Sequence, residues 1–326
     1  MNILITGAAG FIGHNLVYKL DKLGHQVHGV DNFTDYGIIS KEEMTTLHEA
    51  RLCGMLSNTV DSVDIRSPEL SNVFAKWKPD LVIHCAAFPR AKVVDLNPEE
   101  GCSVLTHGLI NLLRCCEEYQ VGKFVYVSSS MVYGDFDMYG YEDMLCNPRG
   151  IYGILKLAGE SLTRDHCERT GMTYTIIRPS AVYGPKDVQD RVVSKFLTAA
   201  MRGEELRVCG ANELLDFTYV DDCVYGIAKA SLSTRSSGKT YNITRGDARP
   251  LLEAAELAVA IAGGGTIKVV EANPRYPSRG TLSNIRAGQD CGYRGMTDIE
   301  QGFQKYYEWL NNYPVLWGGT AISDAT

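Results

Sequence analysis

The stretch that decides the fold opens the chain: Asn2-Ile3-Leu4-Ile5-Thr6-Gly7-Ala8-Ala9-Gly10-Phe11-Ile12-Gly13. An apolar run ends at a glycine-rich turn and restarts with helical spacing, so the stretch predicts a strand, a tight turn and an amphipathic helix. A second apolar run, Val27–Val30, then ends at Asp31. This order is typical of the βαβ unit that opens a dinucleotide-binding domain.

Each glycine of the turn has its own predicted role. Gly7 lets the chain turn tightly, Gly10 lets backbone N–H groups approach a pyrophosphate, and Gly13 lets helix and strand pack closely. The helix N-terminus, with Phe11 and Ile12 in its first turn, supplies partial positive charge for the anion. The turn is therefore predicted to bind a dinucleotide.

Asp31 indicates which dinucleotide binds. At the carboxyl end of the second strand, its carboxylate can accept hydrogen bonds from an adenosine ribose diol and would repel a 2′-phosphate. We therefore expect NAD rather than NADP.

Composition excludes several classes of protein. The 326 residues are 45% apolar and 22% charged, with a net charge of −7 and no run of Lys or Arg, which argues against a nucleic-acid binder. Met1 stands two residues before a core strand and no apolar segment approaches a membrane span, so we expect a cytosolic protein that binds no membrane. The ten cysteines form no C-x-x-C pair, and His107 and His166 have no companion ligands at metal spacing, so no metal site is predicted.

Strand-like and helix-like runs alternate through the first half, which predicts a doubly wound α/β domain with a parallel sheet over residues 1–178. The predicted strands are Ile3–Thr6, Val27–Val30, Thr59–Ile65, Leu81–Cys85, Phe124–Ser128 and Tyr174–Ile177. After Arg178-Pro179 the pattern changes to helices mixed with short strands. Residues 179–326 are expected to form mainly a smaller α+β substrate lobe, with some elements returning to the first domain.

Tyr152 and Lys156 place a phenol and an ammonium four residues apart on one helix face. A fixed cation favours the phenolate and so lowers the pKa of a tyrosine, which prepares it as a base. Tyr119–Lys123 and Tyr225–Lys229 have the same spacing. Only Tyr152 follows a strand that ends in hydroxyl residues, Ser128-Ser129-Ser130, and a hydroxyl there could bind the same reacting oxygen.

These motifs together resemble the extended short-chain dehydrogenases/reductases, specifically the NAD-dependent sugar-nucleotide epimerase/dehydratase group of the UDP-glucose 4-epimerase type. The resemblance covers nearly the whole chain. The matching segments are Thr6–Gly13, Asp31-Asn32, Asp64-Ile65, His84–Ala87, Ser128–Gly134, Tyr152–Lys156, Arg178-Pro179, Tyr183–Pro185 and Asp216–Asp222.

The resemblance implies a role for each matching residue. Tyr152 would be the base, Ser129 its hydroxyl partner, and Lys156 would also hold the nicotinamide ribose. Asp64 would contact the adenine edge together with the Ile65 backbone. The implied cofactor set is Gly7, Gly10, Phe11, Ile12, Gly13, Asp31, Asn32, Asp64, Ile65, Ala86, Ala87, Tyr152 and Lys156.

One departure from the family narrows the chemistry. The sugar 4,6-dehydratases carry Asp and Glu after the hydroxyl residue, where this chain has Ser130 and Met131. A thioether takes no proton from carbon, so dehydration is disfavoured, and so is decarboxylation. The expected reaction is epimerisation, most simply at C4, through a keto-sugar with bound NAD. A keto-sugar reductase that consumes NADH or NADPH and a non-catalytic dinucleotide sensor are the alternatives.

The expected substrate is a nucleotide-diphosphate sugar, held by Ser129, Ser130 and Tyr152. Many 4-epimerases have an Asn and an Arg that face the diphosphate, where this chain has Ala181 and Leu215. Arg191 and Arg279 could supply that charge, or they could be surface arginines. The resemblance also implies a homodimer through the helices over Cys102–Tyr119 and around Tyr152, although apolar faces buried within one chain would look the same.

Overall fold

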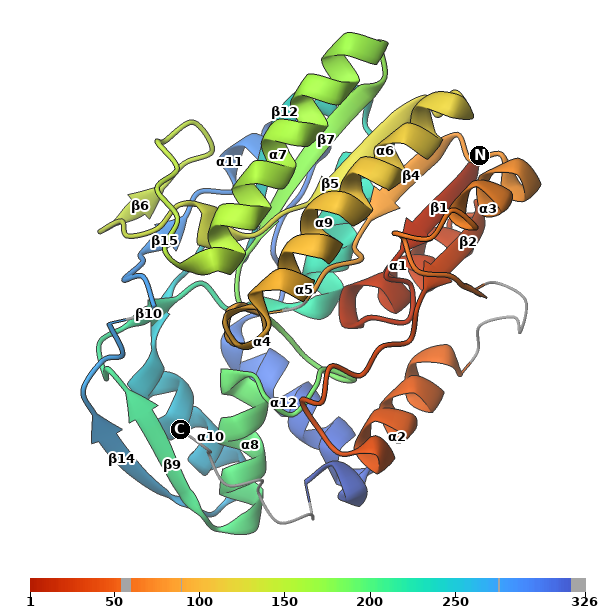
Figure 1. Ribbon diagram of the computed structural model, residues 1–326. Helices are drawn as coiled ribbons and strands as arrows, with labels where there is room; N and C mark the ends of the chain where they lie inside the picture. The colour runs from red at the N-terminus through yellow and green to blue at the C-terminus, as the bar shows by residue number, and fades with distance from the viewer. Residues whose placement is uncertain (54–59, 89, 275, 318–326) are drawn as a thin grey trace.

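A seven-stranded parallel sheet forms the centre of the molecule, in a computed structural model that describes residues 1–53, 60–88, 90–274 and 276–317. The sheet order is β12-β7-β5-β4-β1-β2-β3, and neighbouring strands are parallel throughout. The strands are β1 (Asn2–Thr6), β2 (Gln26–Asp31), β3 (Val60–Ser62), β4 (Leu81–His84), β5 (Lys123–Val127), β7 (Thr173–Pro179) and β12 (Lys239–Ile243). The strand order reverses between β1 and β4, where ligands bind in such sheets. The predicted doubly wound α/β fold is confirmed (Figure 1).

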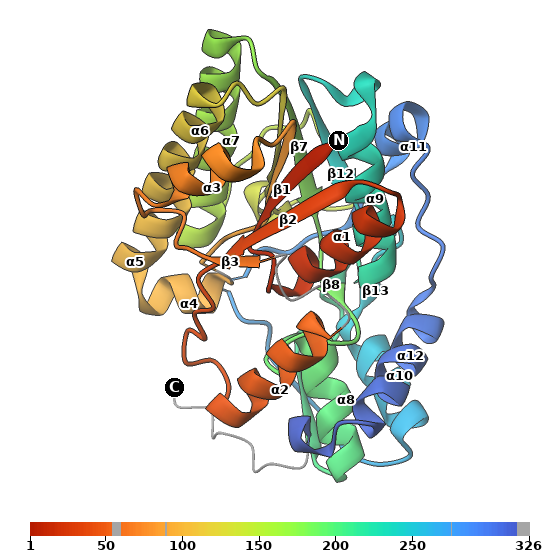
Figure 2. The same cartoon turned by 90° about the vertical axis from the view of Figure 1, so that its right-hand side faces the viewer.

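Helices cover both faces of the sheet, as Figure 2 shows edge-on. One face carries α1 (Phe11–Lys22), α9 (Val220–Leu232) and α11 (Ile285–Cys291), and the other carries α3 (Leu70–Trp77), α6 (Leu109–Glu118) and α7 (Gly150–Thr170). Each face has its own apolar cluster. Burial on both sides explains why the strands are continuous apolar runs, such as the fully buried β4.

The predicted helix over Cys102–Tyr119 belongs to a longer helical run. It consists of α5 (Pro98–Cys102), a π-helical turn over Ser103–Gly108, and α6, and it follows the short helix α4 (Ala91–Leu96). This run packs against α7, and the two lie side by side in Figure 1. The first turn of α7 carries Tyr152.

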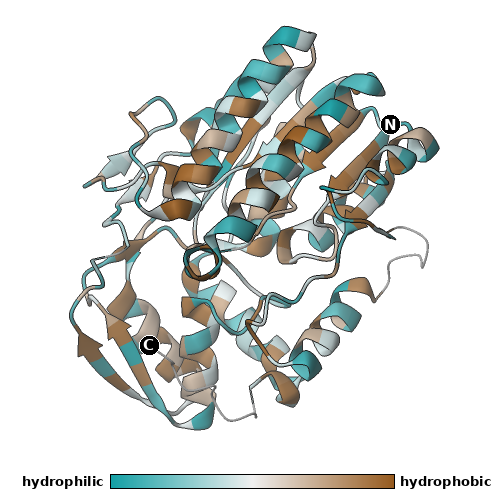
Figure 3. Ribbon diagram, in the orientation of Figure 1, coloured by the Kyte–Doolittle hydropathy of each residue, from teal (hydrophilic) through white to brown (hydrophobic). Residues whose placement is uncertain are grey.

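The second half of the chain adds a smaller group of elements below the carboxyl ends of the strands (Figures 1 and 3). It contains α8 (Val192–Arg202), β9 (Glu205–Cys209), α10 (Leu251–Ala262), β14 (Thr266–Val270) and α12 (Ile299–Asn311). The helix α2 (Lys41–Leu52), from the insert after β2, also lies at this end of the molecule. Two-stranded pairs of short strands complete the structure. Strand β8 (Val182–Tyr183) pairs with β11 (Thr218–Tyr219), and β10 (Leu214–Leu215) pairs with β13 (Arg249–Pro250), both within the second half of the chain. A third pair, β6 (Tyr139–Gly140) with β15 (Thr281–Leu282), joins the two halves.

Several elements after residue 178 pack on the first-half sheet. Strand β12 pairs with β7 from Lys239 to Ile243, and helices α9 and α11 cover the same face as α1. The predicted strand Thr59–Ile65 is shorter in the structure, since β3 spans Val60–Ser62 and residue 59 lies outside the described ranges. Within those ranges, no helix combines the length and the apolar character needed to cross a membrane.

Candidate active site

The glycine turn brings the end of β1, the start of α1 and the loop after β4 into close contact. Gly7 has a φ of 71°, in the left-handed region that favours glycine. A Cβ on Gly7 would lie 2.6 Å from the backbone nitrogen of Ala86, and one on Gly13 would lie 2.0 Å from the carbonyl oxygen of Gly7. Glycine is therefore required at both positions by close backbone approach, as the sequence predicted.

The N-terminus of α1 is open to an anion. Gly10 is the N-cap residue and provides no side-chain cap, so the N–H groups at the start of the helix lack intrahelical partners. The N–H of Gly10 itself donates to the carbonyl oxygen of Gly7 at 3.0 Å, which leaves Phe11 and Ile12 as the first free donors in the helix. The arrangement fits a dinucleotide pyrophosphate.

Arg51, which the sequence analysis did not single out, adds positive charge beside this turn. Its side chain is buried, donates from Nη1 to the carbonyl oxygen of Ala9 at 3.2 Å, and donates from Nε and Nη2 to that of Lys186. It ties α2 to both the glycine turn and the loop after β8. In the sequence, Arg51 is only one of several charged residues in the segment between β2 and β3.

Asp31 lies at the end of β2 and orders the loops around it. One carboxylate oxygen accepts a hydrogen bond from the N–H of Ala9 at 2.9 Å, and the other accepts from that of Phe33 at 2.8 Å. Each carboxylate oxygen can accept a further bond. The position therefore fits the ribose contact that the sequence predicted.

The remaining predicted adenosine contacts lie next to Asp31. The Asn32 side chain donates a hydrogen bond to Asp64 at 3.0 Å. The Nε and Nη2 of Arg66 donate to the two carboxylate oxygens of Asp64 at 2.9 and 2.8 Å. The hydrogen bonds from Arg66 lower the pKa of Asp64 to about 2, so this carboxylate is ionised at neutral pH. Ile65 is buried under α6, and Ala86 and Ala87 follow β4 at the switch point.

Lys156 is buried at the end of β5. Its ammonium donates to the carbonyl oxygen of Val127 at 2.9 Å and lies 5.9 Å from the centre of the Tyr152 ring. Burial lowers the pKa of Lys156 to about 8. The Ser129 side chain accepts a hydrogen bond from the N–H of Met131 at 3.2 Å, which fixes the turn after the strand.

Burial and two nearby side chains shift the pKa of the Tyr152 phenol. Burial raises the pKa of its phenol, while the positive charge of Arg191 and a hydrogen bond with Ser129 lower it. The net shift is upward, whereas the sequence analysis expected Lys156 to lower the pKa. Part of the reason is geometric, because the Lys156 ammonium points to the Val127 carbonyl oxygen. The structure thus brings Ser129, Tyr152 and Lys156 together, with Arg191 as an additional cation.

Arg191 belongs to a cluster of ion pairs that the sequence analysis missed. Its Nε lies 3.4 Å from a carboxylate oxygen of Asp187, which is buried. Arg90 lies 4.0 Å from the same oxygen and donates to Asp190 at 2.6 Å. The grouping of four charged residues within 186–191 was the available signal, but Arg90 lies far away in the sequence.

Arg279 does not lie in that cluster. Its Nη1 donates to the side-chain oxygen of Ser130 at 2.9 Å, so it contacts the residue that follows Ser129. Burial lowers the pKa of Arg279 to about 10. Of the two predicted arginines, Arg191 therefore lies near Tyr152 and Arg279 contacts Ser130.

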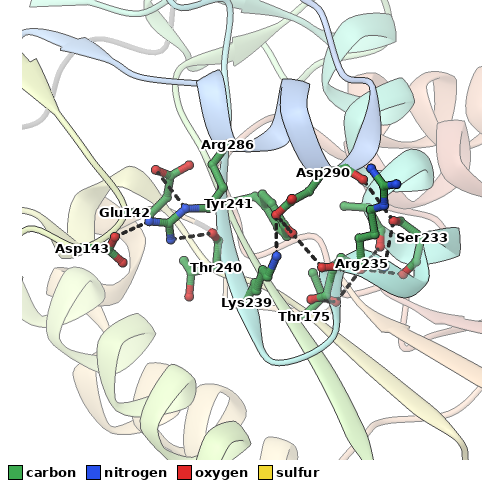
Figure 4. A network of polar contacts seen from close by, with 12 residues as sticks. Glu142, Asp143, Thr175, Ser233, Arg235, Lys239, Thr240, Tyr241, Arg286 and Asp290 are labelled. Atoms are coloured by element: carbon green, nitrogen blue, oxygen red, sulfur yellow. Dashed lines mark hydrogen bonds and ion pairs between the residues drawn. The ribbon is translucent and has the colours of Figure 1, made fainter.

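Other polar residues have structural partners. His84 is buried, and its Nδ1 lies 2.7 Å from the Thr6 hydroxyl, so it is a hydrogen-bonded core histidine. A cavity of about 570 Å³ beside the start of β12 is lined by charges that pair with one another, such as Lys239 with Asp290 at 2.8 Å (Figure 4). In the described part of the chain, no three His, Cys, Asp or Glu side chains gather as a metal site would require.

Comparison with known proteins places this geometry in a family. The model of the NAD dependent epimerase/dehydratase family matches residues 3–244. UDP-glucose 4-epimerase of Mycolicibacterium smegmatis is 30% identical, over 96% of this chain and 99% of its own.

Two solved structures are similar over the same share of the chain. UDP-glucuronic acid 4-epimerase from Bacillus cereus, in complex with UDP-glucuronic acid and NAD, is 26% identical, with 96% of this chain and 99% of that chain covered and a TM-score of 0.87. UDP-glucose 4-epimerase from Thermotoga maritima, with UDP-glucose, is 25% identical at the same coverage, with a TM-score of 0.84. The chain therefore belongs to the NAD-dependent epimerase/dehydratase family and uses NAD as its cofactor.

Proposed function

We propose that this NAD-dependent sugar-nucleotide epimerase inverts the configuration at C4 of its sugar. The observation that carries the proposal is the meeting of Tyr152, Ser129 and buried Lys156 at the carboxyl end of β5. A phenol and a hydroxyl that lie close together can bind one reacting oxygen between them. The similar proteins named above are 4-epimerases of UDP-sugars, which supports the choice of C4.

The residues divide the chemistry as follows. Tyr152 takes the proton of the C4 hydroxyl and returns a proton to that oxygen after inversion, while Ser129 orients the oxygen. Lys156, fixed by Val127, provides a positive charge near the phenol and a donor for the nicotinamide ribose. Bound NAD would supply the acceptor for the C4 hydride and then its donor, so the reaction would have no net redox change. The keto-sugar turns within the site between these two events.

The cofactor set of the sequence analysis remains our proposal for NAD binding. The N-terminus of α1, at Phe11 and Ile12, would hold the pyrophosphate, with Arg51 near it. Asp31 would accept from the adenosine ribose, and Asp64 with Asn32 would border the adenine. Close packing at Gly7 and Gly13 supports this placement, because it brings the turn, the helix and the Ala86 loop within reach of one ligand.

The side chains after Ser129 disfavour elimination. Ser130 donates or accepts only through a hydroxyl that Arg279 already contacts, and Met131 has no ionisable group. Loss of water from a sugar needs a base at carbon and an acid at the leaving oxygen. We therefore expect the keto-sugar to return as an epimer. Arg191, close enough to affect Tyr152, is our candidate for the substrate diphosphate.

We further propose that two copies pair through α6 and α7. Apolar side chains on these helices remain exposed: Ile110 at 42%, Ile151 at 37% and Ile154 at 52%. Exposed aliphatic side chains on adjacent helices support a helical interface. Sedimentation of wild type and Ile154→Glu tests this, with Ile285→Glu on α11 as the control. A dimer that only I154E converts to monomer supports the proposal, and a monomeric wild type contradicts it.

The reaction is tested with a panel of UDP-, GDP-, CDP- and dTDP-sugars, incubated with purified protein and followed by proton NMR. We expect a new anomeric signal from a product of unchanged mass without added NADH. Activity that appears only when NADH or NADPH is supplied would identify a reductase instead. Dinucleotide binding without conversion of any nucleotide sugar would favour the sensor.

A further inference from the structure

A buried carboxylate on α7 binds the residue that directly precedes the proposed catalytic serine. The hydroxyl of Ser128 donates a hydrogen bond to Oε1 of Glu160 at 2.7 Å, and both side chains are buried. Glu160 lies one helical turn after Lys156 and two turns after Tyr152, so the three side chains share one face of α7. The chemistry proposed above gives this carboxylate no role.

Two arginines hold the Glu160 carboxylate in place. Arg178, in β7, donates from Nε to Oε1 at 2.8 Å and from Nη2 to Oε2 at 2.7 Å, and Arg164 donates to Oε2 at 2.8 Å. Together with the bond from Ser128, these contacts fill the four acceptor positions of a carboxylate. Burial raises the pKa of Glu160, but the hydrogen bonds and positive charges outweigh burial and hold the pKa below its usual range. Ser128 therefore donates to a fixed and ionised acceptor.

Arg178 is itself fixed by the segments around it. Its Nη1 donates to the carbonyl oxygen of Glu142 at 3.1 Å, and its guanidinium lies 4.7 Å from the centre of the Tyr133 ring. Tyr133 comes shortly after the serines at 128–130, and its hydroxyl donates to the Asn242 side chain of β12 at 2.6 Å. The Glu160 carboxylate thus joins the end of β5 to α7 and β7 before any substrate binds.

Ser128 passes this fixed position on to Ser129. The backbone N–H of Ser128 donates to the carbonyl oxygen of Ile177 at 2.7 Å, so Ser128 is held through both its backbone and its side chain. The residue before it, Val127, accepts the hydrogen bond from the Lys156 ammonium. Side chains of α7 therefore bind two successive residues directly before Ser129, and the first turn of the same helix carries the proposed base.

Resting on the proposed function, we propose that Ser128 and Glu160 are positioning residues, which hold the Ser129 hydroxyl beside the Tyr152 phenol. Neither residue touches the sugar in this account. A phenol and a hydroxyl that serve one reacting oxygen must both lie within hydrogen-bond reach of it. A displacement of about 1 Å can lower a rate about 100-fold. Loss of the bond between Ser128 and Glu160 should therefore slow the reaction without weakening substrate binding.

The first test measures kcat and KM of Ser128→Ala, with UDP-glucose as the first probe and otherwise with the sugar of the panel above that wild type converts fastest. We expect kcat to fall about 10- to 100-fold. KM and NAD content should stay near those of wild type. Ser231→Ala is the matched control, because it removes another buried serine hydroxyl, which donates to the carbonyl oxygen of Ile227 at 2.7 Å within α9. Its kcat should equal that of wild type.

A second test separates positioning from a merely structural role. If Ser128 acts through Ser129, Ser128→Ala should lower kcat of the Ser129→Ala variant by less than about twofold, because the group that it positions is already gone. Independent effects would instead multiply. Ser128→Thr, which restores a hydroxyl, should recover part of kcat.

The outcomes distinguish this inference from the proposed function. A wild-type kcat in Ser128→Ala, a loss confined to KM, or multiplied losses in the double variant would overturn the inference, while a slow Ser129→Ala would leave the proposed function standing. Conversion of no sugar by wild type would refute the proposed function and this inference with it. If Ser128→Ala fails to fold, Ser128→Cys replaces it, because a thiol is a weak donor. A wild-type kcat in that variant would likewise overturn the inference.

Discussion

The ammonium of Lys156 donates a hydrogen bond to the carbonyl oxygen of Val127 at 2.9 Å. Val127 is the last residue of β5, and Lys156 lies in the second turn of α7, so this bond ties the helix to the strand end. Ser129 follows the strand and Tyr152 opens the helix. The bond therefore sets the position of the phenol relative to the serine hydroxyl, which is the relationship on which the proposed chemistry depends.

Removal of the Tyr152 hydroxyl should abolish most of the activity. We expect Tyr152→Phe to lower kcat about 100- to 10,000-fold, the range for loss of a general acid–base group. NAD content and melting temperature should stay close to those of wild type. Tyr225→Phe is the matched control, because Lys229 lies 5.5 Å from the Tyr225 ring at the same spacing in the sequence. If both variants retain wild-type rates, Tyr152 is not the base.

A methyl group at Gly13 should disrupt the glycine turn. The added Cβ would lie 2.0 Å from the Gly7 carbonyl oxygen, so α1 must move away from the turn. We expect Gly13→Ala to lower the free energy of unfolding by about 1–3 kcal/mol, as overpacking does, and to lower NAD content. Gly122→Ala is the control, since its nearest contact would be 3.4 Å. Urea unfolding and absorbance of the released dinucleotide measure both effects, and unchanged NAD content in G13A would contradict the proposed site.

Replacement of Asp31 should weaken the discrimination between NAD and NADP. We expect Asp31→Ser to bind NAD about 10- to 150-fold more weakly, because the ribose loses a charged hydrogen-bond acceptor. The variant should also accept NADP relatively better, because the repulsion of a 2′-phosphate is gone. Fluorescence titration of dinucleotide-free protein measures both constants. A ratio equal to that of wild type would show that another residue selects the cofactor.

His84 should make the protein less stable in acid. Burial lowers the pKa of His84 to about 3, below the usual 6.5. Between these values the unfolded chain binds a proton that the folded protein excludes, so stability falls as pH drops from about 6.5 towards 3. Below pH 6, His84→Asn should reduce the slope of unfolding free energy against pH by about 1.4 kcal/mol per pH unit. Exposed His107→Asn is the control, and equal slopes in wild type and H84N would contradict the prediction.

Local patterns predicted much of the sheet. The runs at Ile3–Thr6, Leu81–Cys85 and Phe124–Ser128 lie within one or two residues of β1, β4 and β5, because strands buried on both faces need continuous apolar residues. The place of β12 in the sheet was not predictable in the same way. Its residues, Lys239–Ile243, pair with β7 although the helices and strands of the smaller group lie between the two strands in the sequence. That pairing depends on tertiary packing rather than on a local pattern.

In the proposed site, too, some features follow from local sequence and others depend on tertiary packing. The sequence contained the spacing of Tyr152 and Lys156, and the structure brings them together with Ser129 as expected. The direction of the Lys156 ammonium, the contact of Arg279 with Ser130 and the pairing of Arg90 with Asp190 depend on segments far apart in the chain. No local pattern encodes such contacts, so the pKa of Tyr152 was predicted in the wrong direction.

The central claim is that the hydride on C4 leaves the sugar and returns to it within one active site. The most direct measurement uses a UDP-sugar deuterated at C4, incubated in ordinary water until the epimers equilibrate and analysed by NMR and mass spectrometry. The account predicts a C4 epimer that retains the deuterium on C4. An epimer whose deuterium has been replaced by hydrogen from solvent would contradict it.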